Sequence, residues 1–176
     1  LGVPEEKMLL AIGQFIPRKG FDVLLKAAAR LDRDVGIYLV GGEATQEYVA
    51  LREELGLANV HFVGFKPKEA LAEYYKAADA FALPTREDIW GLVINEAMAY
   101  GLPVVTTDRC VAGMELVENG VNGYIVPVGD ENALADRLRC LLSSDMSAMG
   151  RTSLKKIRNY TLENMAKAHM DYLQEW

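Results

Sequence analysis

The sequence is poor in cysteine and histidine. Its 176 residues include two of each, and Cys110 and Cys140 stand far apart without metal-ligand spacing. This usage is typical of free thiols in a reducing compartment rather than of a disulfide framework. His61 and His169 are also well separated and have no cysteine nearby. The sequence therefore predicts no metal site.

Long apolar runs and a surplus of basic residues are also missing. No run approaches the roughly 18 residues that cross a bilayer, and residues 1–4 lack the basic start and apolar core of a signal peptide. The net charge of −6 disfavours non-specific binding to nucleic acid. We expect a cytoplasmic domain without a nucleic-acid partner. Because the first residue is leucine, we expect the chain to be a piece of a longer protein.

The sequence does contain enough apolar residues, 51%, for one sizeable core, so we expect a single domain over residues 1–176. Short apolar runs of strand length alternate along the chain with segments of helical spacing. The predicted strands are 8–12, 35–40, 60–63, 80–83, 104–107 and 124–126. The predicted helices are 21–31, 45–55, 67–78, 92–100, 112–118 and 131–142, and two more helical stretches continue to Trp176.

This alternation predicts the α/β class, with a doubly wound, Rossmann-like parallel sheet of about six strands and helices on both faces. Such a sheet binds its ligand at the carboxyl ends of the strands, near the point where the strand order reverses. The loops 13–20, 41–42 and 84–91 each follow a predicted strand. We therefore expect these three loops to share one rim of the sheet.

The loop 13–20 carries two glycines, Gly13 and Gly20, and two adjacent cations, Arg18 and Lys19. Glycine allows the backbone to approach a ligand closely, and neighbouring cations suit a pyrophosphate. The spacing matches neither the GxxxxGK[ST] phosphate loop nor the GxGxxG dinucleotide loop. The alternative interpretation is a basic surface loop without a ligand.

The segment 84–103 is a polar loop followed by an apolar helix that Gly101 and Pro103 would end. Asp88 and Glu96 stand eight positions apart in it. A carboxylate can accept two hydrogen bonds from a vicinal diol, as in ribose and other sugars. Alternatively, Asp88 caps the helix in a Thr-x-x-Asp pattern that begins at Thr85, and Glu96 only complements the helix dipole.

These stretches together resemble a known family. The segment 88–105 resembles the glutamate–seven residues–glutamate signature of retaining glycosyltransferases of family 4, also called group 1. The loop 13–22 is similar to that family's Gly-Arg-x-x-x-x-Lys-Gly donor loop. The resemblance covers roughly residues 8–142 and includes three further segments, 60–64, 77–79 and 118–123.

The resemblance implies a two-domain glycosyltransferase-B enzyme that needs no metal and acts in polysaccharide biosynthesis. The donor nucleotide-diphosphate sugar would bind to the C-terminal half, which this chain resembles, and the missing N-terminal domain would bind the acceptor. A hexosyl group would pass to a saccharide or lipid-linked acceptor, and the missing domain could contact the inner face of the membrane peripherally. The fragment alone would be inactive.

The family's residues transfer to this sequence position by position. Lys19 would hold the donor pyrophosphate, and Arg18 would replace the charge of the family's loop arginine, which falls at Gln14. The first signature glutamate falls at Asp88, and either Asp88 or its neighbour Glu87 would face the donor sugar. We expect Lys19, Arg18 and Asp88 to be the catalytic residues.

The second signature glutamate is Glu96, which would hold the ribose hydroxyls, while Gly13 would line the donor loop. Phosphate or sugar oxygens would bind the backbone N–H groups that open the helix, those of Trp90, Gly91 and Leu92. The nucleobase would lie near Val63, Gly64 and Phe65. Taken alone, Trp90 is also compatible with a core residue and Gly91 with a plain turn.

Two other functions remain compatible with the sequence. A sugar-nucleotide epimerase has a related fold and a similar donor, but it would be expected to carry its own catalytic acids. A stand-alone nucleotide-binding module would use the same loops without group transfer. The length of the full open reading frame would distinguish these hypotheses, since a two-domain transferase needs roughly 350–400 residues.

Overall fold

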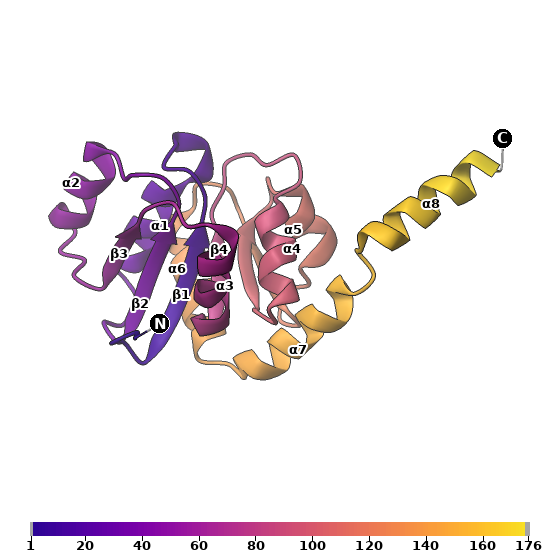
Figure 1. Cartoon of the computed structure of the whole chain (residues 1–176). Coiled ribbons are helices and arrows are strands. Elements are labelled where there is room, and N and C mark those ends of the chain that lie inside the picture. Colours follow the sequence, from indigo (N-terminus) through magenta and orange to yellow (C-terminus); the bar gives the residue numbers. More distant parts are fainter. Residues whose placement is uncertain (1, 175–176) are drawn as a thin grey trace.

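The computed structural model describes residues 2–174 (Figure 1). The strands are β1 (Lys7–Ile12), β2 (Val35–Val40), β3 (Val60–Val63), β4 (Ala80–Leu83), β5 (Val104–Thr107) and β6 (Gly123–Val126). The helices are α1 (Phe21–Ala28), α2 (Gln46–Glu54), α3 (Lys68–Ala77), α4 (Leu92–Ala99), α5 (Val111–Leu116), α6 (Glu131–Leu142), α7 (Met146–Ile157) and α8 (Leu162–Gln174). Every predicted strand and helix is present, although Trp176 lies outside the described residues.

The strands form one parallel sheet in the order β3-β2-β1-β4-β5-β6. The chain moves outward from β1 to β3, then returns to the middle and moves outward again from β4 to β6. The order therefore reverses between β1 and β4, where their carboxyl ends lie next to each other. This confirms the doubly wound fold and places the expected ligand crevice at this point.

Helices cover both faces of the sheet (Figure 1). The helices α1 and α6 pack on one face, where Leu9 of β1 and Leu24 of α1 belong to the same buried cluster. The helices α3, α4 and α5 pack on the other face, where Leu10 of β1 meets the cluster that contains Met98. Because neighbouring strand residues are buried on opposite faces, the central strands are nearly continuous apolar runs.

Helix ends differ slightly from the expected positions. Helix α1 ends at Ala28, earlier than predicted, because the N–H groups of Arg30 and Leu31 bond to carbonyls three residues back rather than four. Helix α5 stops at Leu116 because Val117 is extended. Asp130 caps α6, since its side chain accepts hydrogen bonds from two N–H groups of the first turn.

The C-terminal helices differ from the rest. Helix α7 packs along α4, and a Cβ at Gly150 would lie 2.0 Å from the carbonyl oxygen of Gly101. Helix α8 then leaves the body of the molecule (Figure 1), and its described side chains are exposed. Within residues 2–174, no helix is both long enough and apolar enough to span a membrane.

Candidate functional site

Two loops interlock where the strand order reverses. The loop 13–20 follows β1, and the loop 84–91 follows β4. The carbonyl oxygen of Arg18 accepts from the backbone N–H of Arg86 at 2.7 Å and from the hydroxyl of Thr85 at 3.0 Å. The two loops therefore hold each other directly through their backbones. This confirms that they share one rim.

The first loop is more regular than predicted, because residues Pro17–Lys19 form a single turn of 3₁₀ helix, η1. Proline fits the start of this turn, since its φ angle is already fixed near the helical value. Gly20 follows with φ 68°, and a Cβ there would lie 2.0 Å from the carbonyl oxygen of Pro84. Only glycine allows this contact between the loops.

The cations and the carboxylate of the two loops meet. The Nζ atom of Lys19 lies 2.5 Å from Oδ2 of Asp88, and these side chains are only 14% and 13% exposed. A guanidinium nitrogen of Arg18 lies 3.8 Å from Oδ1 of Asp88. Glu87 is exposed, and it contributes its backbone carbonyl to a hydrogen bond from Arg18 at 3.1 Å. Of the two neighbouring acids, Asp88 is the one placed against the cations.

The alternative interpretation, in which Asp88 caps α4, is wrong. The residue before α4 is Gly91, with φ 95° and no side-chain cap, and a Cβ there would lie 2.7 Å from the sulfur of Cys110. Thr85 also does not cap the helix, because its hydroxyl donates to carbonyls of the two loops. The Asp88 carboxylate is instead engaged by Lys19.

The start of α4 faces the same rim. The first N–H groups of a helix have no intrahelical acceptor, which makes this end suited to anions. Trp90 is half-buried, its Nε1 donates to Asn95 at 2.8 Å, and its carbonyl accepts from Ala112 at 2.8 Å. Leu92 is exposed, with 68% of its surface accessible. The turn 90–92 at the start of α4 is therefore held by the contacts of Trp90 with Asn95 and Ala112, while the side chain of Leu92 is exposed to solvent.

Glu96 lies in the second turn of α4, where the helix-dipole effect has weakened. Its Oε2 accepts a 2.7 Å hydrogen bond from the hydroxyl of Tyr75, and the ring of Tyr75 stacks on Tyr100 at 5.0 Å. Burial, followed by the hydrogen bond to Glu96, raises the pKa of Tyr75. A carboxylate offers about four lone-pair positions, so Tyr75 leaves others available.

The remaining predicted residues lie along the same rim, and Gly13 lies against the Lys19 side chain, since a Cβ at Gly13 would be 3.4 Å from it. Gly13 donates to the last carbonyl of β2, and Gln14 is exposed beside it. Val63 ends β3, and its carbonyl accepts from Gly41 at 3.0 Å. Gly64 and Phe65 follow; both are exposed, and Phe65 is 80% accessible.

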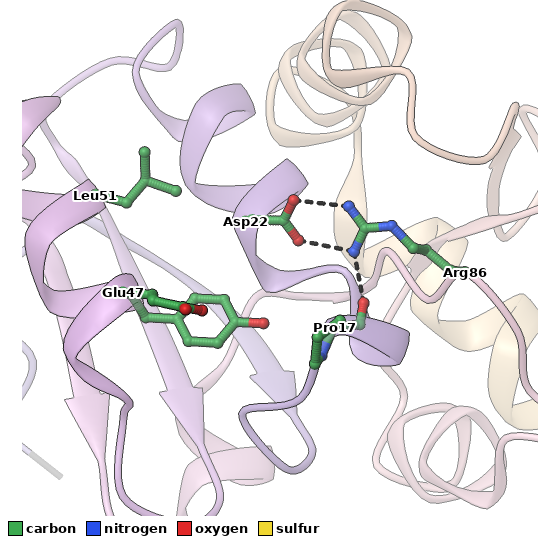
Figure 2. Close-up of a pocket in the computed structure, with 6 residues that line it drawn as sticks. Pro17, Asp22, Glu47, Leu51 and Arg86 are labelled. Atoms are coloured by element: carbon green, nitrogen blue, oxygen red, sulfur yellow. Dashed lines mark hydrogen bonds and ion pairs between the residues drawn. The ribbon is translucent and has the colours of Figure 1, made fainter.

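The ion pair of Arg86 with Asp22 was not predicted from the sequence. Arg86 of the second loop reaches Asp22 of α1 and the carbonyl of Pro17 (Figure 2). The two charged residues are separated by 64 positions and follow no periodicity, so no local signal could have identified them. Tyr75, the partner of Glu96, was missed for the same reason.

Among the described residues, no three or more His, Cys, Asp or Glu side chains form a group that could hold a metal ion. Both cysteines are free; Cys110 is buried and Cys140 is exposed. Burial raises the pKa of the Cys110 thiol. A raised pKa disfavours the thiolate, so Cys110 behaves as a packing residue under Gly91.

Known proteins are similar in sequence to this chain. The family model described as "Glycosyl transferases group 1" matches residues 2–163. D-inositol 3-phosphate glycosyltransferase of Corynebacterium diphtheriae is 34% identical, over 92% of this chain and 41% of the relative. The protein of the same name in Corynebacterium urealyticum is 36% identical, over 95% of this chain and 43% of the relative. The chain thus spans less than half the length of these relatives.

Solved structures share the fold. Sucrose-phosphate synthase from Thermosynechococcus elongatus superposes with a TM-score of 0.87 at 29% identity, over 99% of this chain and 46% of that one. HepE from Anabaena, in complex with UDP-glucose, superposes with a TM-score of 0.87 at 26% identity, over 99% of this chain and 50% of that one. With its doubly wound sheet and the family match over most of its length, the chain belongs to the group 1 glycosyl transferases.

Proposed function

We propose that this chain is the donor-binding domain of a retaining glycosyltransferase and binds a nucleoside-diphosphate sugar at the rim between β1 and β4. The observation that carries the proposal is the Lys19–Asp88 pair at the point where the strand order reverses. The complexes of HepE with UDP and with UDP-glucose support it, because HepE shares the fold over 99% of this chain.

Lys19 and Arg18 bind the diphosphate in this proposal. The ammonium group of Lys19 has three N–H donors, and the Asp88 carboxylate occupies one of them. As the glycosidic bond breaks, negative charge accumulates on the departing diphosphate. The two cations and the N-terminus of α4 stabilise that charge from fixed positions, so the chain's own groups supply the electrostatics without a protein-bound metal.

Asp88, rather than Glu87, takes the place of the first signature glutamate. Its Oδ2 holds Lys19, while its Oδ1 lies 3.8 Å from Arg18 and can accept a hydrogen bond from a sugar hydroxyl. Glu87 has an exposed side chain and contributes to the loop through its carbonyl. Exchanging Asp88 for asparagine should therefore weaken UDP-glucose binding more than exchanging Glu87 for glutamine.

The rest of the nucleotide follows the rim toward α4 and β3. Glu96 holds the ribose hydroxyls with the oxygen positions that Tyr75 leaves available. The base lies near the end of β3, mainly on backbone groups of Val63, Gly64 and Phe65. The exposure of Gly64 and Phe65 supports this placement, because a ligand can reach them.

The complete protein would contain a second domain for the acceptor, which is consistent with the length of the relatives. The full enzyme would transfer a hexosyl group to a saccharide or lipid-linked acceptor. It would act in the cytoplasm, with the second domain at the inner face of the membrane. The chain by itself would bind the donor nucleotide without transferring sugar.

Titration calorimetry with UDP tests the proposal. Lys19→Ala should weaken binding by about 1.5–3 kcal/mol, because it removes a charge-assisted contact. Gln14→Ala should cost less, since an amide carries no charge. Lys26→Ala is the matched control: Lys26 lies on α1, its Nζ is 3.8 Å from Glu131, and its loss should leave UDP affinity unchanged. Equal losses for Lys19→Ala and Gln14→Ala would contradict the assignment of Lys19.

A further inference from the structure

Arg86 fastens the loop after β4 to the start of α1 (Figure 2). Its two terminal nitrogens donate to the two carboxylate oxygens of Asp22, at 2.8 and 2.7 Å. The first of these nitrogens also donates to the carbonyl of Pro17 at 2.5 Å. Paired, parallel contacts of this kind fix the relative orientation of both groups as well as their distance.

The contacts of Arg86 lie on both sides of Lys19 in the chain. Its side chain holds Pro17 before Lys19 and Asp22 after it, while its backbone N–H donates to the carbonyl of Arg18 at 2.7 Å. Arg86 therefore holds the chain at three points, two in the short turn η1 and one at the start of α1. The loop after β4, which carries Arg86, also carries Asp88, the partner of the Lys19 ammonium group.

We infer that the Arg86–Asp22 pair is a positioning device for the donor diphosphate, which holds η1 against the β4 loop and so keeps the Lys19 ammonium group at Asp88. This inference rests on the proposed function of the site. Arg86 acts through Lys19 and is a positioning residue rather than a catalytic one.

Asp22 and Arg86 each stabilise the ionised form of the other. Burial alone would raise the pKa of Asp22, but the hydrogen bonds and positive charge of Arg86 outweigh it, and the pKa of Asp22 lies below its ordinary value. The hydrogen bonds to Asp22 raise the pKa of Arg86. Both groups are ionised at neutral pH. Their side chains are 31% and 38% exposed, and pairs this exposed add little to folding stability.

Direct binding of the diphosphate by Arg86 is the competing explanation, and the surroundings oppose it. The cavity beside Arg86, of about 230 Å³, is lined by two carboxylates, Asp22 and Glu47, together with Tyr48 and Leu51. Because the Asp22 and Arg86 charges offset each other, Glu47 leaves the cavity with a net negative charge, which disfavours an anion there. The guanidinium group is also already engaged by Asp22 and Pro17. Its contribution to the ligand is therefore indirect.

The substitution Asp22→Asn separates the two explanations, because it removes a negative charge but keeps the shape of the side chain. If Arg86 bound the diphosphate directly, UDP affinity would stay the same or rise. Positioning predicts that affinity falls about three- to tenfold by calorimetry. Arg86→Lys should give a similar loss, because lysine keeps the charge but lacks the planar fork.

Double variants test whether the pair acts as one unit and through Lys19. Asp22→Asn combined with Arg86→Ala should bind UDP no more weakly than Arg86→Ala alone, since the contact is already lost. In a Lys19→Ala background, Asp22→Asn should cause no further loss. Fully additive losses in either combination would overturn the inference. Should Arg86→Ala fail to fold, Asp22→Asn and Arg86→Lys carry the same test.

The matched control is Glu131→Gln, which disrupts the Lys26–Glu131 ion pair of α1 on the side of α6. It should leave UDP affinity unchanged, and a loss equal to that of Asp22→Asn would overturn the positioning role. The two levels of the proposal fail differently. If Lys19→Ala bound UDP with wild-type affinity, the proposed donor site would be refuted. If Lys19→Ala bound UDP weakly but Asp22→Asn bound it with wild-type affinity, only the positioning device would be refuted.

Discussion

The rim between β1 and β4 and the helix α8 differ in how far their side chains are held by contacts with the rest of the molecule. At the rim, residues distant in sequence are fixed by short contacts, such as those of Lys19 with Asp88 and of Arg86 with Asp22. Helix α8 has an apolar pattern of its own, yet Met170 and Leu173 are 56% and 68% exposed. A pattern thus predicts the element, but its packing partner decides how much each residue matters.

Helix α8 is separated from the rim by open space rather than packed against it. A cavity of about 570 Å³ opens where α8 passes the start of α4, and its walls include Trp90, Leu92, Met165 and Ala168. Within the described residues, the apolar side of α8 is exposed to solvent. Substitutions at the rim should therefore affect stability or affinity, and those on the outer part of α8 should not.

At the rim, the largest expected effect is that of Gly20→Ala, which should lower the free energy of unfolding by about 2–4 kcal/mol. Alanine at φ 68° is strained, and its Cβ would also meet the Pro84 carbonyl. Urea denaturation measures the loss. Gly56→Ala is the control, because Gly56 has φ 60° but open space around its Cβ position, so only the backbone strain of about 1–2 kcal/mol applies. Equal losses of unfolding free energy for Gly20→Ala and Gly56→Ala would contradict the close contact between Gly20 and the Pro84 carbonyl.

Glu96→Gln should weaken UDP binding about tenfold, close to 1.4 kcal/mol, with little change in melting temperature. Glutamine keeps the shape but loses the charged acceptor for two ribose hydroxyls. Wild-type protein should prefer UDP over its 2′,3′-dideoxy analogue, and the variant should lose most of that preference. A lower melting temperature with unaltered UDP affinity would show that Glu96 serves only the contact with Tyr75.

Acid should remove the contribution of the Arg86–Asp22 pair to stability. The pKa of Asp22 is lowered in the folded protein, so its contribution is present above the unfolded value of about 3.9 and disappears as pH falls through the folded value. The difference in unfolding free energy between wild type and Asp22→Asn, which for a pair this exposed is at most about 1 kcal/mol, should therefore shrink below about pH 4. Urea titrations at pH 7, 4 and 3 measure it; a difference independent of pH would contradict the ion pair.

The smallest effect is expected on α8. Met170→Gln and Leu173→Gln should each change the unfolding free energy by no more than about 0.5 kcal/mol, because both side chains are already exposed. Leu24→Ala on α1 supplies the contrast: Leu24 is fully buried, and the loss should be about 2–5 kcal/mol. Comparable losses of unfolding free energy for the α1 and α8 variants would contradict the conclusion that α1 is packed in the core and α8 is not.

Much of the fold could be predicted because its signals are local. The bounds of β2 were predicted correctly, since its run of five hydrophobic residues and one glycine lies between the charged segment 32–34 and the Gly41-Gly42 turn. The cap at Asp130 and the left-handed turn at Gly101, with φ 77°, follow from the chemistry of single residues. The turn η1 was missed, because its form depends on contacts with the neighbouring loop.

For the site, the sequence by itself determined which loops follow the strands, where their cations and carboxylates stand, and which family they resemble. Only the tertiary structure decided how they pair: Lys19 with Asp88 across 69 positions, Arg86 with Asp22 across 64, and Tyr75 with Glu96 across 21. It also turned Asp88 from a possible helix cap into the partner of a lysine. The physical reason is that spacing along a chain fixes helices and strands, whereas the order of strands in the sheet fixes which loops touch.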